Sequence, residues 1–230
     1  MLVTGADHRR TLPPAAESVF RDRLDLARRF ADLLATDALT RGLIGPREVP
    51  RLWERHLLNC AVVTDLLPPG ARIVDVGSGA GLPGVVMAIR RPDLQVDLVE
   101  PLQRRVAFLD EVVRRLQLAD AIRVLRGRAE QAQMVAEVGD AEWVTARAVA
   151  PLDRLVRWCL PLLQPGGRLL ALKGSSAAAE LTEHRAVLHR LGGRDMKVVQ
   201  CGTGVLAQPT AVVVLRCRST IARPRKKGLA

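Results

Sequence analysis

A glycine-rich segment is the part of the sequence best suited to hold a ligand. It reads Asp75-Val-Gly-Ser-Gly-Ala-Gly-Leu-Pro-Gly84 and follows a short apolar run. Glycines at alternate positions (Gly77, Gly79 and Gly81) let the backbone turn sharply and let a ligand lie against main-chain atoms. A purely structural tight turn would use the same residues, so the loop alone leaves both interpretations open.

Two acidic residues favour a binding loop. Glu100 ends the next predicted strand, about 20 residues after the loop, where a carboxylate can accept hydrogen bonds from both hydroxyls of a ribose. Asp75 ends an otherwise apolar strand, where burial is costly unless a polar partner is near. A cationic or amine-bearing ligand would supply that partner. A solvated carboxylate after a strand is the alternative for Glu100.

The spacing of the glycines distinguishes between nucleotide cofactors. A dinucleotide loop has the form Gly-x-Gly-x-x-Gly, whereas here Leu82 takes the sixth position and Pro83 crowds the start of the helix. The Gly-Lys-Ser/Thr of a nucleoside triphosphatase loop is absent. Asp-x-Gly-x-Gly-x-Gly resembles motif one of the class I methyltransferases, which use S-adenosylmethionine. A dinucleotide oxidoreductase stays as a minor alternative.

From residue 71 onward, short apolar runs alternate with helical stretches. This alternation predicts an α/β fold of the class I methyltransferase (Rossmann-like) type, with a doubly wound, mostly parallel seven-stranded sheet. The last two runs are expected to form an antiparallel hairpin. The expected strands are residues 72–76, 95–100, 122–125, 143–147, 169–173, 197–201 and 211–217. Helices are expected up to residue 91 and at 104–118, 152–163 and 181–191.

The N-terminal part of the chain has a different pattern. Apolar residues recur at spacings of three and four from Phe20 to Leu34, and a second helix is expected from Pro50 to about Leu66. We therefore expect three parts: a helical N-terminal cap at 1–70, a methyltransferase domain at 71–218 and a basic tail at 219–230.

The positive charge gathers at the C-terminal end. The chain has 230 residues, with 35 Lys and Arg against 24 Asp and Glu, a net charge of +11. Residues 196–230 contain seven basic and no acidic side chains, whereas residues 1–70 contain ten basic and nine acidic ones. A basic terminus without acidic residues favours contact with nucleic-acid phosphates.

Several other classes of protein are excluded by composition. No uninterrupted apolar run approaches the roughly 18 residues of a membrane-spanning helix, and the first residues do not form an apolar signal segment. We therefore expect a soluble, cytoplasmic protein without a membrane partner. The four cysteines lack a Cys-x-x-Cys pair, so neither a metal site nor a disulfide framework is expected.

The segment after the fourth predicted strand, residues 145–152, bears on the methyl acceptor. It lacks both the Asn/Asp-Pro-Pro-aromatic element of many amine methyltransferases and a cysteine nucleophile. A guanine N7 carries a lone pair and no proton, so its methylation needs alignment and a suitable electrostatic field but no general base. Arg147 ends a buried apolar strand, where a charge favours a ligand or a carboxylate partner.

Taken together, these motifs resemble the RsmG (GidB) family of bacterial 16S ribosomal RNA guanine-N7 methyltransferases. The resemblance runs in order from about residue 47 to residue 174. The motifs that carry it are Arg55-His-Leu-Leu-Asn59, Asp75 to Gly84, Glu100-Pro-Leu-Gln-Arg-Arg-Val-Ala-Phe-Leu109, Gly127-Arg-Ala-Glu130, Ala146-Arg-Ala-Val-Ala-Pro-Leu152 and Ala171-Leu-Lys-Gly174.

The resemblance implies a role for each matching residue. Residues of the glycine loop would bind S-adenosylmethionine, Glu100 would hold its ribose, and Ala129 with Glu130 would contact its adenine. Arg147 would stand at the methyl-transfer end as both a cofactor-binding and the catalytic residue. The loop residues assigned to the cofactor are Asp75, Gly77, Gly79, Gly81 and Leu82.

The implied partner is 16S rRNA or the 30S subunit, and the implied target is one guanine of the 530 loop. We expect a monomer without a bound metal. The residues expected to bind RNA are Arg55 and His56 in the cap, Lys173 after the fifth strand, and Arg223, Arg225, Lys226 and Lys227 in the tail. By spacing alone, Arg55, His56 and Asn59 would be a solvated helix face.

Two other functions remain open at this point. A small-molecule methyltransferase with incidental basicity would keep its activity without residues 218–230 and would ignore RNA. A non-catalytic ribosome-binding protein with a vestigial loop would not bind S-adenosylmethionine.

Overall fold

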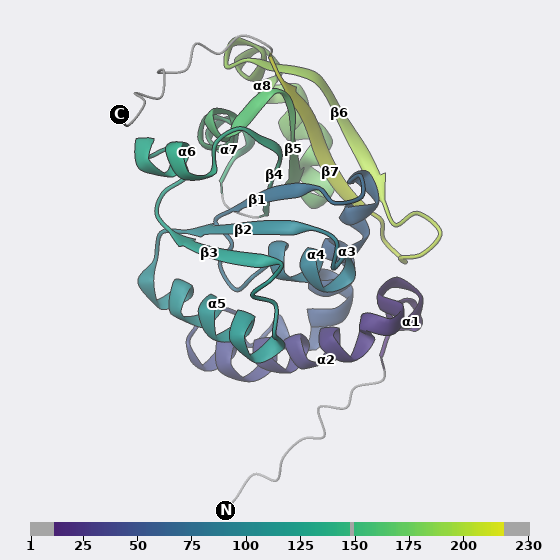
Figure 1. Cartoon of the computed structure of the whole chain (residues 1–230). Helices are drawn as coiled ribbons and strands as arrows, with labels where there is room; N and C mark the ends of the chain where they lie inside the picture. The colour runs from purple at the N-terminus through teal and green to yellow at the C-terminus, as the bar shows by residue number, and fades with distance from the viewer. Residues whose placement is uncertain (1–11, 148–149, 219–230) are drawn as a thin grey trace, which may run out of the picture.

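The computed structural model describes residues 12–147 and 150–218. Its centre is a sheet of seven strands in the order β3-β2-β1-β4-β5-β7-β6, as Figure 1 shows. Strands β1 to β5 pair in parallel, and β7 runs antiparallel to both of its neighbours. The predicted doubly wound sheet with an antiparallel C-terminal hairpin is confirmed. The strands are β1 (Arg72–Val76), β2 (Gln95–Glu100), β3 (Ile122–Arg126), β4 (Ala141–Arg147), β5 (Leu163–Leu172), β6 (Gly193–Cys201) and β7 (Thr210–Cys217).

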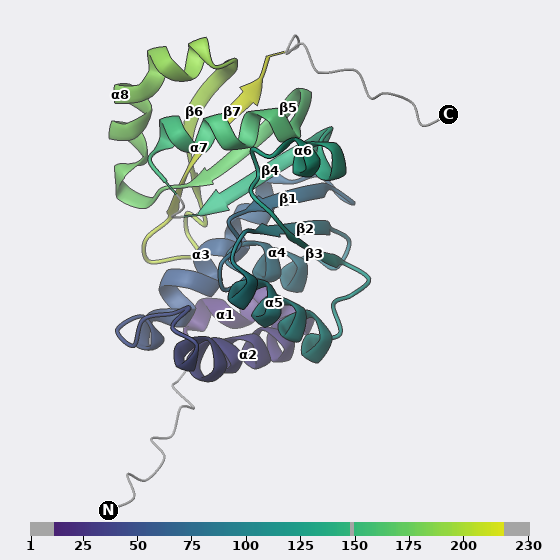
Figure 2. The same ribbon diagram turned by 90° about the vertical axis from the view of Figure 1, so that its left-hand side faces the viewer.

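Helices cover both faces of the sheet, which gives the three layers visible in Figure 2. Because both faces are covered, β1 and β2 are buried at every position after the first, which explains why most of their buried residues are apolar. One face carries α1 (Pro14–Phe20), α2 (Leu24–Leu33), α3 (Leu58–Ala61), α4 (Gly84–Arg90) and α5 (Gln103–Leu116). The other carries α6 (Ala132–Val138), α7 (Leu152–Cys159) and α8 (Ala177–Arg190).

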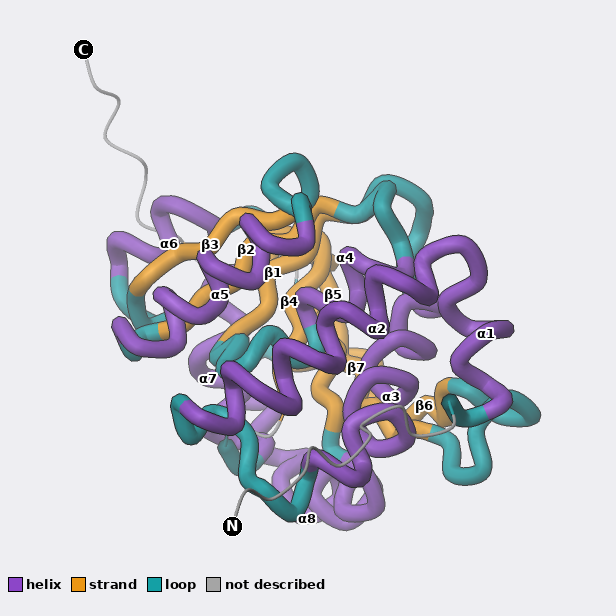
Figure 3. The backbone as a smooth tube through the Cα atoms, turned by 90° about the horizontal axis from the view of Figure 1, so that it is seen from below, coloured by secondary structure: helices purple, strands orange, loops and turns teal. Residues whose placement is uncertain are grey.

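Short 3-10 and π turns extend the N-terminal helices. The two helices predicted there are therefore longer and less regular than expected. Figure 3 shows these segments in purple across the orange strands. In the first segment, η1 (Arg21–Arg23) and η2 (Leu34–Ala38) flank α2. In the second, η3 (Val49–Arg51), η4 (Leu52–Leu57) and η5 (Val62–Leu66) flank α3. The remaining turns are η6 (Leu160–Leu162) and η7 (Gly174–Ser176).

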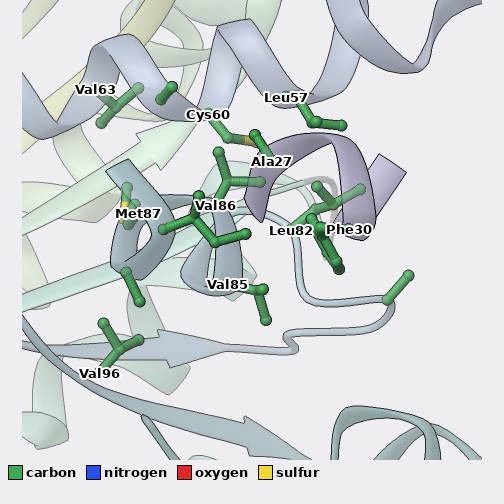
Figure 4. Packing of buried hydrophobic residues seen from close by; sticks show 14 of the residues in the cluster. Ala27, Phe30, Leu57, Cys60, Val63, Leu82, Val85, Val86, Met87 and Val96 are labelled. Carbon is green, nitrogen blue, oxygen red and sulfur yellow. The ribbon is translucent and has the colours of Figure 1, made fainter. Parts of the chain in front are cut away.

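The N-terminal helices are packed directly onto the sheet layer. Phe30 of α2 and Cys60 of α3 belong to the same buried cluster as Val86 of α4 and Val96 of β2, as Figure 4 shows from close by. Arg90 also donates a hydrogen bond to the carbonyl oxygen of Ala61, at 2.6 Å. The boundary predicted at residue 70 therefore separates helices from strands in the sequence, while one cluster of buried residues spans both sides.

Three details differ from the sequence-based expectation. The first helix begins at Pro14 and not at Phe20. Proline suits the first turn of a helix. Helix α6 was not expected, because its seven residues bury only Met134 and Val138 and so carry a weak pattern. Strand β5 begins at Leu163, earlier than the expected start at residue 169, and it contains a bulge where the register with β4 shifts between Ala141 and Trp143.

Candidate functional site

A cavity of about 610 Å³ opens at the carboxyl ends of the parallel strands. This is the edge at which open α/β sheets bind their ligands. Because the sheet order is β3-β2-β1-β4, the loop after β1 lies in the middle of this edge, with β2 and β3 on one side and β4 on the other. The lining comes from four places: residues 43–48 with His56, the glycine loop, the segments after β2 and β3, and Arg147 with Trp158.

The glycine loop exposes its main chain to the cavity. Gly77, Gly79 and Gly81 have φ angles of 69°, 58° and 89°, a region that favours glycine. Gly77 and Gly79 line the cavity together with Leu82, whereas Gly81 does not. A side chain on Gly81 would come within 2.6 Å of Val85, so this glycine allows helix α4 to pack against the loop.

Glu100 is fixed by main-chain donors at the end of β2. The side chain is fully buried. One carboxylate oxygen accepts the N–H of Gly79 and the other accepts the N–H of Leu102, both at 3.0 Å. Each oxygen has a further lone pair, so the carboxylate can also accept hydroxyl groups from a ligand in the cavity.

Beside Glu100, the segments after β2 and β3 form the apolar part of the cavity. Leu102 is 45% exposed, unusually high for a leucine, and it lines the cavity. Ala129 is buried and Glu130 is exposed, and both line the cavity as the sequence predicts. A flat, mostly apolar ring system with polar edges suits this arrangement.

Asp75 lies beneath the glycine loop and does not line the cavity. Its Oδ2 atom accepts the N–H of Gly84 at 3.1 Å, at the start of α4, and its Oδ1 atom is buried without a partner among the described residues. Burial raises the pKa of Asp75 to about 7. A side chain on Gly84 would lie 2.7 Å from Oδ2, so Asp75 and Gly84 fit each other closely.

Arg147 reaches the cavity from the end of β4 and meets the N-terminal helices there. Its Nη1 atom lies 2.8 Å from Nδ1 of His56, and Nε2 of His56 lies 2.7 Å from the carboxylate of Glu48. A guanidinium group only donates hydrogen bonds, so Nδ1 is the acceptor and the ring carries its proton on Nε2. Burial, and the charge of Arg147 next to it, hold the pKa of His56 below its usual value of 6.5.

Glu48 was not predicted from the sequence. It lines the cavity, and its other carboxylate oxygen lies 3.4 Å from Arg55. Glu48 is separated from His56 by eight residues that include an irregular turn, so no helical spacing points to the pair. The one usable signal is that a buried histidine needs polar partners for its ring nitrogens. Trp158 and Leu102 were also missed as lining residues.

The residues predicted to bind RNA lie in different surroundings. Arg55 is exposed beside the cavity, whereas His56 is only 8% exposed and has protein partners at both ring nitrogens. Lys173 is also largely buried: it pairs with Glu180 at 2.8 Å and donates to the carbonyl oxygen of Ala150 at 2.6 Å. Arg223, Arg225, Lys226 and Lys227 lie outside the described residues.

Residues 12–147 and 150–218 contain neither a candidate metal site nor a membrane-spanning helix. No group of three or more His, Cys, Asp or Glu side chains in this part of the chain could hold a metal ion. No helix within it is long and apolar enough to cross a membrane.

Solved structures resemble this fold at low sequence identity. A putative S-adenosyl-L-methionine-dependent methyltransferase from Methanococcus maripaludis aligns with a TM-score of 0.57 at 12% identity, over 86% of this chain and 94% of that one. Fibrillarin from Aeropyrum pernix, solved with natively bound S-adenosyl-L-methionine, aligns with a TM-score of 0.51 at 20% identity, over 70% and 75%. The class I methyltransferase fold predicted from the sequence is confirmed.

Sequence relatives are much closer. The ribosomal RNA small subunit methyltransferase G of Salinispora arenicola is 60% identical over 219 residues, covering 93% of this chain and 90% of the relative. The protein of the same name from Mycobacterium marinum is 54% identical over 205 residues, covering 89% of each. The GidB family model, described as rRNA small subunit methyltransferase G, matches residues 23–209. The chain therefore belongs to the GidB family of rRNA small subunit methyltransferase G proteins.

Proposed function

We propose that the protein transfers the methyl group of S-adenosylmethionine to N7 of a guanine in the 530 loop of 16S rRNA. The relatives that cover about nine-tenths of the chain bear the name of a small-subunit rRNA methyltransferase. The observation that carries the proposal is the cavity itself. Along one edge of the sheet it brings together the buried carboxylate of Glu100, the glycine loop, and Arg147, which has no carboxylate partner among the described residues.

The cofactor is S-adenosylmethionine, which supplies a methyl group on a positively charged sulfur. The cavity fits its adenosine half at the β2 and β3 end. The buried carboxylate of Glu100 faces a ribose, and Leu102 and Ala129 offer apolar contact to an adenine. The main chain of Gly77 and Gly79 leaves room for the chain between ribose and sulfur, because neither residue has a side chain.

The sheet order then gives the direction of the rest of the cofactor. If the ribose is held at the end of β2, the amino-acid part extends past the loop after β1 toward β4. Arg147 lies at that end, and among the described residues it forms no ion pair with a carboxylate. We therefore assign the carboxylate of the methionine part to Arg147, since guanidinium groups bind carboxylates through paired hydrogen bonds.

The chemistry of guanine N7 matches the other groups in the cavity. N7 attacks through a lone pair and loses no proton, so alignment with the methyl group is the main requirement. The two titratable side chains that line the cavity beside Arg147 already have partners: His56 at both ring nitrogens, and Glu48 at both oxygens. This arrangement favours an acceptor that needs no general base.

Exposed arginines around the mouth of the cavity favour a polyanionic substrate. Arg47 and Arg51 lie on either side of Glu48 in the sequence, and Arg104 lies two residues after Leu102. Arg126 ends β3, and Arg128 lies just after it. In the described part of the chain none of these five forms an ion pair. We propose that they bind RNA phosphates together with Arg55 and the basic tail, which makes RNA affinity fall steeply with salt.

Transfer of a tritiated methyl group to 30S subunits tests this proposal. The labelled 16S rRNA is treated with borohydride and aniline, which cleave the chain at N7-methylguanine, and the break is mapped by primer extension. We expect one break in the 530 loop, absent with Arg147→Ala. Label on protein, on another base or on another atom of guanine would overturn the proposal, and naked 16S rRNA tested in parallel shows whether the assembled subunit is needed.

A further inference from the structure

Arg147 is held by an unusual kind of partner. An arginine that must point in a fixed direction is commonly paired with a carboxylate, which also neutralises it. Here the partner is the imidazole of His56, at 2.8 Å, and the ring accepts the hydrogen bond without a negative charge. The guanidinium is therefore oriented while its positive charge stays available to an anion in the cavity.

This arrangement works only while His56 is neutral with its proton on Nε2. A protonated ring would present an N–H to the guanidinium and place two cations at hydrogen-bond distance. The other neutral tautomer would also turn a donor toward Arg147. Glu48 prevents that, because its carboxylate lies 2.7 Å from Nε2 and requires a proton there.

Both supporting residues come from the N-terminal part of the chain, far from Arg147 in the sequence. His56 lies in η4 and is separated from Arg147 by 91 residues. Glu48 lies between the cavity-lining segment 43–45 and η3. The contact thus links the segment over the cavity to the end of β4.

We infer that His56 and Glu48 are positioning residues for Arg147, and that His56 couples the affinity for the cofactor to pH. The inference rests on the proposed contact between Arg147 and the amino-acid part of the cofactor. Neutral His56 directs the guanidinium into the cavity, Glu48 selects the tautomer, and protonation of the ring releases Arg147 from this position.

The charges around His56 determine the direction of the pH effect. Arg147 from β4 and Arg55 from the same helical segment disfavour a protonated ring, Glu48 favours it, and burial disfavours it more than any of these charges. The neighbouring thiol of Cys60 has its pKa raised to about 11 by burial and stays neutral. The pKa of His56 is therefore lower than that of a free imidazole, so the ring is neutral at pH 7 and becomes protonated only under more acidic conditions.

Calorimetry with S-adenosylhomocysteine from pH 5 to 7.5 tests the inference without requiring catalysis. In the unmodified protein we expect the affinity for S-adenosylhomocysteine to decrease once the pH is below the pKa of His56, by up to about tenfold per pH unit. Asp75 titrates in the same range, but it does so in every variant, so the comparison between variants isolates His56.

His56→Asn is the decisive variant, because the amide oxygen of Asn takes the place of Nδ1 and cannot be protonated. We expect it to bind within about threefold of the unmodified protein at pH 7.5 and to lose the acid-dependent fall. His56→Ala, which has no acceptor, should bind about tenfold more weakly at every pH. Thermal unfolding of each variant separates these effects from loss of folding.

Glu48→Gln keeps an oxygen for Nε2 but removes the charge that favours protonation, so the acid-dependent fall should move to lower pH. Glu54→Gln is the matched control, with the same charge change at an exposed position of the same helical segment. It should leave the profile unchanged. NMR of the ring nitrogens, assigned with His56→Asn, should show Nδ1 unprotonated at pH 7.

Four results would overturn the inference. An acid-dependent fall that persists in His56→Asn would assign it to another group. A protonated Nδ1 at pH 7 would contradict the tautomer. If Arg147→Ala binds S-adenosylhomocysteine normally, the proposed role of Arg147 fails and the inference with it, whereas a loss in Arg147→Ala without effects in the His56 variants overturns the inference alone.

Discussion

At the β2 and β3 end of the cavity, Glu100 is held by two main-chain N–H groups, whereas at the β4 end Arg147 is held by the side chain of His56. The donors to Glu100 lie 21 and two residues away in the sequence, and His56 lies 91 residues from Arg147. The first end is a product of the strand-loop-helix unit itself. The second depends on how the N-terminal helices pack on the sheet.

This difference predicts how each end responds to change. A carboxylate held by backbone donors in a buried position is oriented before any ligand arrives. A guanidinium held by one imidazole can be released by a single proton or by a shift of one helix. The adenosine end should therefore tolerate changes in the N-terminal helices, whereas the methyl-transfer end should not.

The largest effect is expected at the adenosine end. Glu100→Ala removes the acceptor for both ribose hydroxyls, and each hydrogen bond to a charged group contributes about 1.5–3 kcal/mol. Affinity for S-adenosylhomocysteine should fall at least about 100-fold in calorimetry. Glu142→Ala, at an exposed position of β4 that does not line the cavity, is the control and should change affinity by less than about threefold. Equal losses in both variants would show that Glu100 has no special role.

An intermediate effect concerns stability and pH. The pKa of Asp75 is about 7 in the folded protein, against an ordinary value of 3.8, so between these pH values the folded state holds one more proton than the unfolded state. Stability should then decrease as pH rises through this window, by up to about 1.4 kcal/mol per pH unit. Asp75→Asn, which cannot ionise, should lack this slope.

Urea unfolding of both proteins at pH 4.5, 5.5 and 6.5 measures the difference. A difference in unfolding free energy that stays constant with pH would show that Asp75 is ionised in the folded state. In that case the buried Oδ1 atom would need a partner that the described residues do not supply.

The smallest effect is expected for Arg55→Ala, at the exposed edge of the methyl-transfer end. Its contact with Glu48 is 3.4 Å long and its side chain is 57% exposed, so stability should change by less than about 0.5 kcal/mol. The affinity of this variant for S-adenosylhomocysteine should stay within about twofold of that of the unmodified protein. If Arg55 binds RNA phosphate, the salt dependence of rRNA binding should weaken by about one unit in its slope. An unchanged slope would remove Arg55 from the RNA-binding surface.

Much of the fold could be predicted because its signals are local. The short, mostly apolar runs of β1 and β2 predict strands, and the glycines between β1 and α4 predict a tight turn. The order of the motifs indicated the family. Helices with a strong apolar pattern were predicted and a helix with a weak one was not. Helix α5 buries six apolar residues along one face and was predicted nearly in full, whereas α6 buries two and was missed.

For the cavity, too, residues within one local unit were predicted, whereas contacts between distant segments were missed. Gly77, Gly79, Leu82 and Glu100 line it as predicted, since they belong to one strand-loop unit and its neighbour. Glu48 was missed because its contact with His56 depends on an irregular turn and on the packing of that segment over β4. The sequence also did not predict that Lys173 is buried beside Glu180, because the two residues meet only when α8 packs against the end of β5.

The claim that the cavity has two separately held ends is tested most directly by comparing two ligands. S-adenosylhomocysteine contains both adenosine and an amino-acid part, whereas 5′-methylthioadenosine lacks the amino-acid part. We expect Arg147→Ala to weaken the first by about tenfold or more and the second by less than about twofold, while Glu100→Ala weakens both equally. If Arg147→Ala weakened both ligands equally, the two ends would not be separate and the account would be contradicted.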